Sequence, residues 1–247
     1  MLLVISIALS LPAVQTKIAK YCTEEFNKKL GTNIAIDKIA LTIFGTVKIK
    51  QLLIKDHHKD TLIYAKQLNT KILDHKKLFN GDLIFGDIRF NGFYLNLKNY
   101  KNEKFTNLDK FIEIFDDGKP SSGKFLMLAD AIYINDGKFL LSDENRKDPK
   151  DLELKKLEAR LTSFKIKGSN VDFEIEKLKF KDHRGIDLKN LESKFTYTKS
   201  NIILKNLKAT TLNSEIEGSI KMSYDRKDLV DFNNKVIWDF DIINSKI

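Results

Sequence analysis

The spacing of apolar residues along the chain changes at Gly31. Before this glycine, the segment VQTKIAKYCTEEFNKKLG carries apolar residues at roughly helical spacing, and Gly31 stands where such a helix would end. We therefore expect an amphipathic helix over residues 15–31. After Gly31 apolar and polar residues alternate with a period of two, which predicts β-strands to the end of the chain. The apolar residues of the helical segment are Val14, Ile18, Tyr21, Cys22, Phe26 and Leu30.

A phrase of alternating apolar residues around a glycine recurs along the strand region. Its glycines are Gly45, Gly92, Gly137 and Gly185, which lie 47, 45 and 48 residues apart. Such glycines suit tight turns between strands whose side chains alternate between two faces. A further strand pair is expected around residues 202–207 and 216–224.

A strand-built period near 46 residues indicates a solenoid, a propeller or an elongated sheet. A propeller would need four strands per period, so an elongated, open, curled antiparallel β-sheet fits better. We expect each strand to have one apolar face and one polar, lysine-rich face. One short helix interrupts the strands at TNLDKFIEIFDDG, where Thr106 or Asn107 can cap the start and Gly118 ends it. The strand region 32–247 stops in mid-pattern at WDFDIINSKI, so we expect an incomplete sheet.

Composition narrows the function classes. Apolar residues make up 42% of the chain and charged residues 31%, which is enough apolar material to form a core. A single cysteine, Cys22, excludes an internal disulfide framework. The net charge is +9, but only five of the 43 basic residues are arginine and the lysines are spread among 34 acids. Nucleic-acid recognition favours clustered arginine, so we expect no nucleic-acid partner.

The chain opens with an almost uncharged run, MLLVISIALSLPAV. As a helix, residues 2–14 would reach about 20 Å, which is short of the ~30 Å hydrocarbon core. We interpret residues 1–14 as a truncated transmembrane anchor or signal-anchor segment. The helix over 15–31 then either caps the domain that follows or continues from the anchor along the membrane surface.

No arrangement in the sequence indicates catalysis. The segment GKPSSGK at residues 118–124 matches a phosphate-binding pattern, but a helix precedes it, a strand follows it, and Phe125 stands where Ser or Thr would bind magnesium. The cluster DHHKD at residues 56–60 has the residue types of metal ligands, and we interpret it as a solvated polar turn. No serine is set apart as a nucleophile. We therefore expect no catalytic residues, no metal, no cofactor and no enzyme.

Two stretches resemble a known family. They are LPAVQTKIAKYCTEEFNKKLGTNIAIDKIALTIFGTVKIKQLLIKDHHKDTLIYAKQL and YKNEKFTNLDKFIEIFDDGKPSSGKFLMLADAIYINDGKFLLSDEN, and both are similar to the N-terminal part of the AsmA-like inner-membrane component of the bacterial translocation and assembly module, in its Bacteroidetes-like form. The resemblance implies one helix in the inner membrane and a U-shaped β-groove crossing the periplasm. It also implies phospholipid as cargo and an outer-membrane β-barrel partner. The family's C-terminal region, which meets that barrel, is absent from this sequence.

The resemblance assigns the alternating apolar residues to the lining of a lipid groove. Without it, the same alternation would favour the dry core of a β-sandwich. The candidate lining residues are Ile39, Leu41, Ile43, Val47, Ile49, Ile88, Phe90, Phe93, Leu95, Leu97, Ile132, Ile134, Phe139 and Leu141.

The leading hypothesis is thus an inner-membrane-anchored periplasmic protein that shields acyl chains and helps move phospholipid toward the outer membrane. The alternative is a periplasmic scaffold or chaperone that assists outer-membrane protein insertion or secretion by strand augmentation. A polysaccharide-binding protein ranks last, because 17 Phe against one Trp and seven Tyr favour burial over exposed aromatic platforms.

Overall fold

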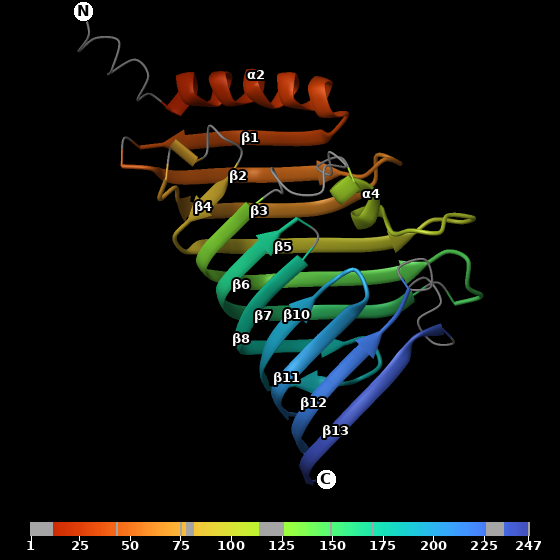
Figure 1. The fold of residues 1–247 in the computed structure, drawn as a ribbon. Helices are drawn as coiled ribbons and strands as arrows, with labels where there is room; N and C mark the ends of the chain where they lie inside the picture. Colours follow the sequence, from red (N-terminus) through yellow and green to blue (C-terminus); the bar gives the residue numbers. More distant parts are fainter. Residues whose placement is uncertain are drawn as a thin grey trace, which may run out of the picture.

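The protein is a single, large, open, mixed β-sheet with few helices (Figure 1). The computed structural model describes residues 12–42, 44–74, 76–77, 82–113, 126–148, 150–168, 170–225 and 235–246. Among these residues the named helices are α2 (Pro12–Leu30) and α4 (Asn107–Glu113). The 13 strands are β1 (Asn33–Leu41), β2 (Thr46–Lys55), β3 (Thr61–Lys71), β4 (Leu83–Phe85), β5 (Ile88–Asn99), β6 (Leu126–Asp143), β7 (Lys150–Lys167), β8 (Asn170–Asp182), β9 (Asp187–Leu188), β10 (Asn190–Tyr197), β11 (Asn201–Thr210), β12 (Glu215–Ser223) and β13 (Ile237–Lys246).

Most strands pair with the next long strand along the chain, in the order β1-β2-β3-β5-β6-β7-β8-β10-β11-β12-β13. All these pairs are antiparallel except β5 with β6, and β4 also runs parallel to β6. The expectation of a wholly antiparallel sheet is therefore wrong at this place. The physical reason is the connection: residues 100–125 include α4 and are long enough for the crossover that a parallel pair needs.

Two of the four recurring glycines lie inside strands and not in turns. Gly45 and Gly185 occupy turns with positive φ, as predicted. Gly92 lies within β5 with a φ of +64°, and Gly137 lies within β6. A left-handed residue inside a strand forms a β-bulge, which suits glycine as well as a turn does. The two settings cannot be told apart from the alternating pattern alone.

The bulges are aligned across neighbouring strands. Gln51 in β2 and Asp136 in β6 also have positive φ, +54° and +53°. The register pairs none of Gln51, Gly92 and Asp136, but the pairs on either side of them keep the same offset, so these three residues lie at one level across the sheet. The alternation in β2, β5 and β6 therefore shifts by one residue at the same level. The step keeps the apolar side chains of both halves on one face, and the Phe90 and Phe93 rings accordingly meet at 5.0 Å across the bulge.

The register confirms that the sheet has one apolar and one polar face. Directly paired residues share a face of a sheet, so a chain of partners traces that face across the strands. One such row on the apolar face is Ile39, Ile49, Leu68, Phe90, Ile134, Ala159 and Leu178. The matching row on the other face is Lys48, Asn69, Arg89, Tyr133, Arg160 and Lys177.

The predicted N-terminal helix lies beside β1, at the first edge of the sheet (Figure 1). Three of its polar side chains, Gln15, Thr16 and Asn27, both donate to and accept from the backbone of one β1 residue each. Their partners are Leu41, Ile39 and Ile34, respectively. These contacts are what the capping alternative expects of the helix. Residues 1–11 of the expected anchor lie outside the described residues, and among the helices described none is both long and apolar enough to span a membrane.

The short helix and the late strand pair also form where the pattern predicts them. Thr106 caps α4: its hydroxyl accepts from the Asp109 amide at 3.2 Å, while its own amide donates to the Asp109 carboxylate at 3.1 Å. The expected end at Gly118 lies outside the described residues. The predicted strands around 202–207 and 216–224 are β11 and β12.

Candidate functional site

The predicted lining residues gather on the apolar face, except Ile43, which lies outside the described residues. The centre of this face is closely packed, with Ile88 3% and Ile132 6% exposed against a surround that includes Phe90 and Ile134. Toward β1 the face opens, and Leu41 is 44% exposed. The remaining lining residues are Ile39, Val47, Ile49, Phe93, Leu95, Leu97, Phe139 and Leu141, of which all but the buried Val47 are half-buried.

The apolar face continues beyond the predicted lining residues, across β7 and β8 and on to β13. The Phe164, Phe173 and Phe195 rings stack in succession across β7, β8 and β10, with centroids 5.7 and 4.5 Å apart. The register extends this row through Leu204, Ile220 and Phe240 to β13. Phe240 is 56% exposed and stacks on Trp238, which is 44% exposed. The available signal was the alternation of apolar residues within β10–β13, which continues the pattern of the earlier strands.

One end of the sheet carries a second repeat, which is polar. A buried aspartate ends each of β2, β6 and β8 or directly follows it, and its carboxylate accepts from the backbone amide two residues further on. These aspartates are Asp56, Asp143 and Asp182, with 2%, 5% and 6% exposure, and the amides belong to His58, Asn145 and Arg184. The sequence signal was an aspartate at the end of an alternating run.

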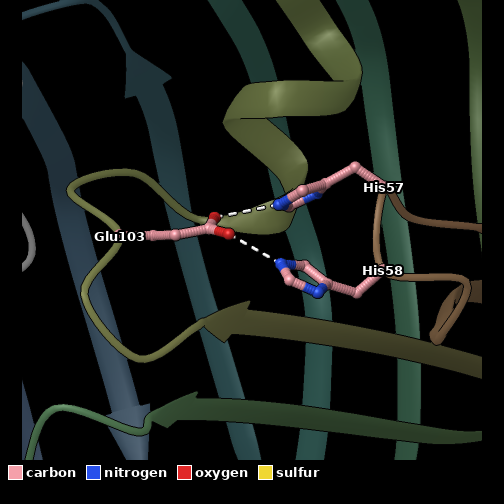
Figure 2. Close-up of side chains that lie close together, drawn as sticks. All are labelled: His57, His58 and Glu103. Atoms are coloured by element: carbon pink, nitrogen blue, oxygen red, sulfur yellow. Dashed lines mark hydrogen bonds and ion pairs between the residues drawn. The ribbon is translucent and has the colours of Figure 1, made fainter.

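Two histidines and a glutamate converge in the first of these turns. Nε2 of His57 donates to one carboxylate oxygen of Glu103 at 2.9 Å, and Nε2 of His58 donates to the other at 2.6 Å (Figure 2). His57 and His58 lie in the β2–β3 turn, whereas Glu103 lies in the loop between β5 and α4. Burial works to raise the pKa of Glu103, but the hydrogen bonds from the two imidazoles outweigh it and hold that pKa below its usual range.

The turn expected at residues 56–60 is present, but Asp56 within it is buried and not solvated, and the two imidazole rings do not point to opposite sides. Opposite faces would hold for neighbours on a strand. Here the residues turn, with Lys59 at a φ of +68°, and both rings reach the same carboxylate.

A buried network fixes both loops. The Tyr100 hydroxyl lies 2.8 Å from the Asp56 carboxylate and 2.9 Å from the Asp60 carboxylate. The side-chain amide of Asn107, which is 0% exposed, donates to Asp56 and to the Asn96 carbonyl, each at 2.9 Å. Burial, followed by the hydrogen bonds to the two aspartates, raises the pKa of Tyr100 above its ordinary value. Tyr100 therefore acts as a donor that joins the β5–α4 loop to the β2–β3 turn.

The parallel pair brings the next turn to the same place. Because β5 and β6 run in the same direction, Asn99 and Asp143 end side by side, and the Asn99 amide donates to Asp143 at 3.1 Å. Lys98 bridges Asp60 at 3.2 Å and Glu144 at 2.8 Å. Burial works to lower the pKa of Lys98, and these two carboxylates outweigh it and raise that pKa. The β2–β3 turn, the β5–α4 loop and the β6–β7 turn thus form one polar cluster.

No protein-family profile matches this chain, and no curated protein matches it. The resemblance to AsmA-like proteins therefore rests on the two quoted stretches alone. The segment that matches a phosphate-binding pattern, residues 118–124, lies outside the described residues.

Proposed function

We propose that this protein holds the acyl chains of phospholipid against the apolar face of its sheet. As an inner-membrane-anchored protein of the periplasm, it helps move phospholipid toward the outer membrane, where an outer-membrane β-barrel is its partner. The anchor and the partner come from the family resemblance, and the lipid-binding face is argued from the strands.

The single observation that carries the proposal is an apolar face that is partly open. All described strands belong to one sheet, so no second sheet stacks on this face within the described residues, as it would in a sandwich. Half-buried and exposed apolar residues run along it from Leu41 in β1 to Phe240 in β13. Each CH₂ removed from water gains about 0.8 kcal/mol, so an acyl chain lying across several strands gains several kcal/mol.

The opposite face explains how the protein would remain in water with lipid bound. Its cations lie over aromatic rings: the Arg89 guanidinium is 3.9 Å from the Tyr133 ring centroid, and the Lys138 ammonium is 5.6 Å from that of Tyr94. The headgroup needs no dedicated pocket, because it stays in water at the rim while the acyl chains are covered.

The proposal is tested by purifying the full 247-residue chain after contact with membranes, without detergent, and weighing bound phospholipid by native mass spectrometry. Leu95→Glu and Phe240→Glu place a charge on the apolar face, and we expect both to lose bound lipid. Asn91→Glu is the matched control, because it places the same charge on the opposite face of β5. A folded parent without lipid, or equal lipid in all three variants, would contradict the proposal.

A second candidate, strand augmentation by a scaffold or chaperone, is favoured by β13. Among the described residues no strand pairs with its outer side, and every residue of the strand is exposed. Ile243→Pro places a proline in this exposed strand, at a position that the register with β12 leaves unpaired. If this variant loses binding of a barrel-strand peptide while Phe240→Glu retains bound lipid, the scaffold explanation replaces the lipid one.

A further inference from the structure

Two imidazole nitrogens and a carboxylate from two separate loops meet at one solvent-accessible point (Figure 2). We infer that His57, His58 and Glu103 bind a divalent transition-metal ion, with Zn²⁺ the best match to this ligand set. The inference is independent of the proposed lipid function, because the cluster lies at the turn end of the sheet and shares no residue with the lining of the apolar face.

The ligand atoms are already close to a metal-binding arrangement. One imidazole nitrogen each from His57 and His58 and a carboxylate oxygen of Glu103 all lie within 4.8 Å of one another. Tetrahedral Zn²⁺ with bonds of about 2.0–2.1 Å separates its ligand atoms by roughly 3.3 Å. The His57 and His58 nitrogens lie 2.9 and 2.6 Å from two different oxygens of Glu103, which are hydrogen-bond separations, so each nitrogen–oxygen pair needs to part by roughly 0.4–0.7 Å.

The rings are held in position before any ion binds. The Asp56 carboxylate accepts from the backbone amides of His58 at 3.0 Å and Asp60 at 2.9 Å, which fixes the turn that carries both histidines. The Tyr100 ring packs on His58 with centroids 3.8 Å apart and lies edge-on to His57 at 5.5 Å. Tyr100 also accepts from the Glu103 amide at 3.0 Å through its own carbonyl. Residues that orient ligands in this way commonly contribute 10–100-fold to metal affinity.

Ligand chemistry and access select the kind of ion. Two imidazoles with one carboxylate suit Zn²⁺ and its neighbours in the transition series, whereas Ca²⁺ and Mg²⁺ prefer all-oxygen sites. The side chains of His57, His58 and Glu103 are 33%, 45% and 26% exposed, so an ion can enter from water without repacking the core. Three protein ligands leave the fourth position to solvent or to a ligand from outside.

The test is titration of the purified full-length protein with Zn²⁺ alone by isothermal calorimetry. We expect one ion per chain in the parent. His58→Gln and Glu103→Gln should each weaken binding at least tenfold, because each removes one of three ligands. His183→Gln is the matched control: it removes an imidazole from the corresponding turn after β8 and should leave Zn²⁺ affinity unchanged. Thermal unfolding without metal identifies any variant that fails to fold, and His57→Gln then provides a second ligand variant.

Co²⁺ provides a readout that a purely structural role would not move. Bound at this site, it should show the visible absorption of a four-coordinate ion, and that absorption should disappear in His58→Gln and persist in His183→Gln. Two results would overturn the inference: a folded parent that binds no Zn²⁺ at about 1 mM, or binding that survives unchanged in both ligand variants.

Discussion

The two edges of the sheet are built differently. At the first edge, three side chains of α2 form hydrogen bonds with backbone donors and acceptors of β1. They are the amides of Gln15 and Asn27 and the hydroxyl of Thr16. At the other edge, β13 is exposed along its whole length, and Ile237, Ile242 and Ile243 are each at least 60% exposed. One edge is therefore satisfied by uncharged polar groups, whereas the other presents an unpaired strand with apolar side chains.

This difference between the β1 and β13 edges shows how an open sheet can limit strand addition to one side. Unpaired strand edges recruit further strands, and proteins block them with charge, proline, bulges or a covering element. Here α2 covers β1 with paired hydrogen bonds in place of a neighbouring strand. A strand from another protein can thus pair with β13 but not with β1. Our two proposed functions differ here, because only the scaffold function requires such pairing.

The largest expected effect comes from detaching the open edge. A Cβ at Gly218 would lie 2.1 Å from the Asp241 carbonyl oxygen, which is backbone of β13 and cannot rotate away. Gly218→Ala should therefore break β12–β13 pairing and cost about 1–3 kcal/mol of unfolding free energy. Urea unfolding measures the loss, and amide exchange locates it in β13.

Gly86→Ala is the control for this change, since its new Cβ would meet a side chain at an ordinary 3.6 Å. Fluorescence anisotropy of Trp238, the single tryptophan, should fall only in Gly218→Ala. Unchanged exchange throughout β13 would show that this edge is held more firmly than the register suggests.

A smaller effect is expected at the closed edge. Asn27 donates to the Ile34 carbonyl at 2.7 Å and accepts from the Ile34 amide at 2.9 Å. Asn27→Ala should cost about 1–2 kcal/mol and speed exchange of the Ile34 amide, because the edge of β1 is then open to water. Glu25→Ala, which alters an exposed ion pair with Lys28 on the same helix, should change neither quantity. If the Ile34 amide stays protected in Asn27→Ala, α2 does not close the edge through its side chains.

The smallest expected effect concerns a charged contact, between Asp182 and Arg184, whose contribution to stability depends on pH. Hydrogen bonds from the Arg184 side chain hold the pKa of Asp182 below its usual range. A lowered pKa contributes stability above the unfolded pKa near 3.8, and this contribution is lost as pH falls through the folded pKa. Asp182→Asn should thus be less stable than the parent by about 1 kcal/mol at pH 7, with the difference shrinking below pH ~4.

The closed edge should not follow this pH dependence, because its three side chains do not titrate. The ratio of the hydrogen-exchange protection of the Ile34 amide to that of the β13 amides should stay constant from pH 7 to pH 4, once both are corrected for intrinsic exchange rates. A protection ratio that changes over this range would mean that charge contributes to closing β1.

Periodicity alone predicted the parts of the fold that depend on neighbours in sequence. The helix ending near Leu30, the hairpin at Gly45 and the capped helix at Thr106 all follow from local spacing and caps. The sequence pattern predicts a turn at Gly92 where the structure has a bulge, because both settings need the same left-handed backbone. The parallel pair β5–β6 was missed, since strand direction depends on where a long connection returns.

The candidate sites divide in the same way. The apolar face could be predicted because alternation assigns side chains to faces, and the same alternation continues it through Phe195 to Phe240, beyond the predicted lining residues. The convergence of His57 and His58 on Glu103 could not be predicted. Its partners are about 45 residues apart in sequence, and only the fold shows that the β5–α4 loop returns over the β2–β3 turn.

The aligned bulges produce a shift in the apolar alternation of the sequence, and this shift does not depend on which apolar side chains are present. In β2 the apolar residues run in one frame through Val47 and Ile49, then continue in the other frame through Leu52 and Ile54. Inserting one residue beside such a slip would turn half a strand inside out, whereas inserting two would preserve it. Chains with this architecture should therefore share the spacing of the positions at which the alternation shifts by one residue, even where their amino acids differ. That spacing offers a way to find relatives that direct sequence comparison does not.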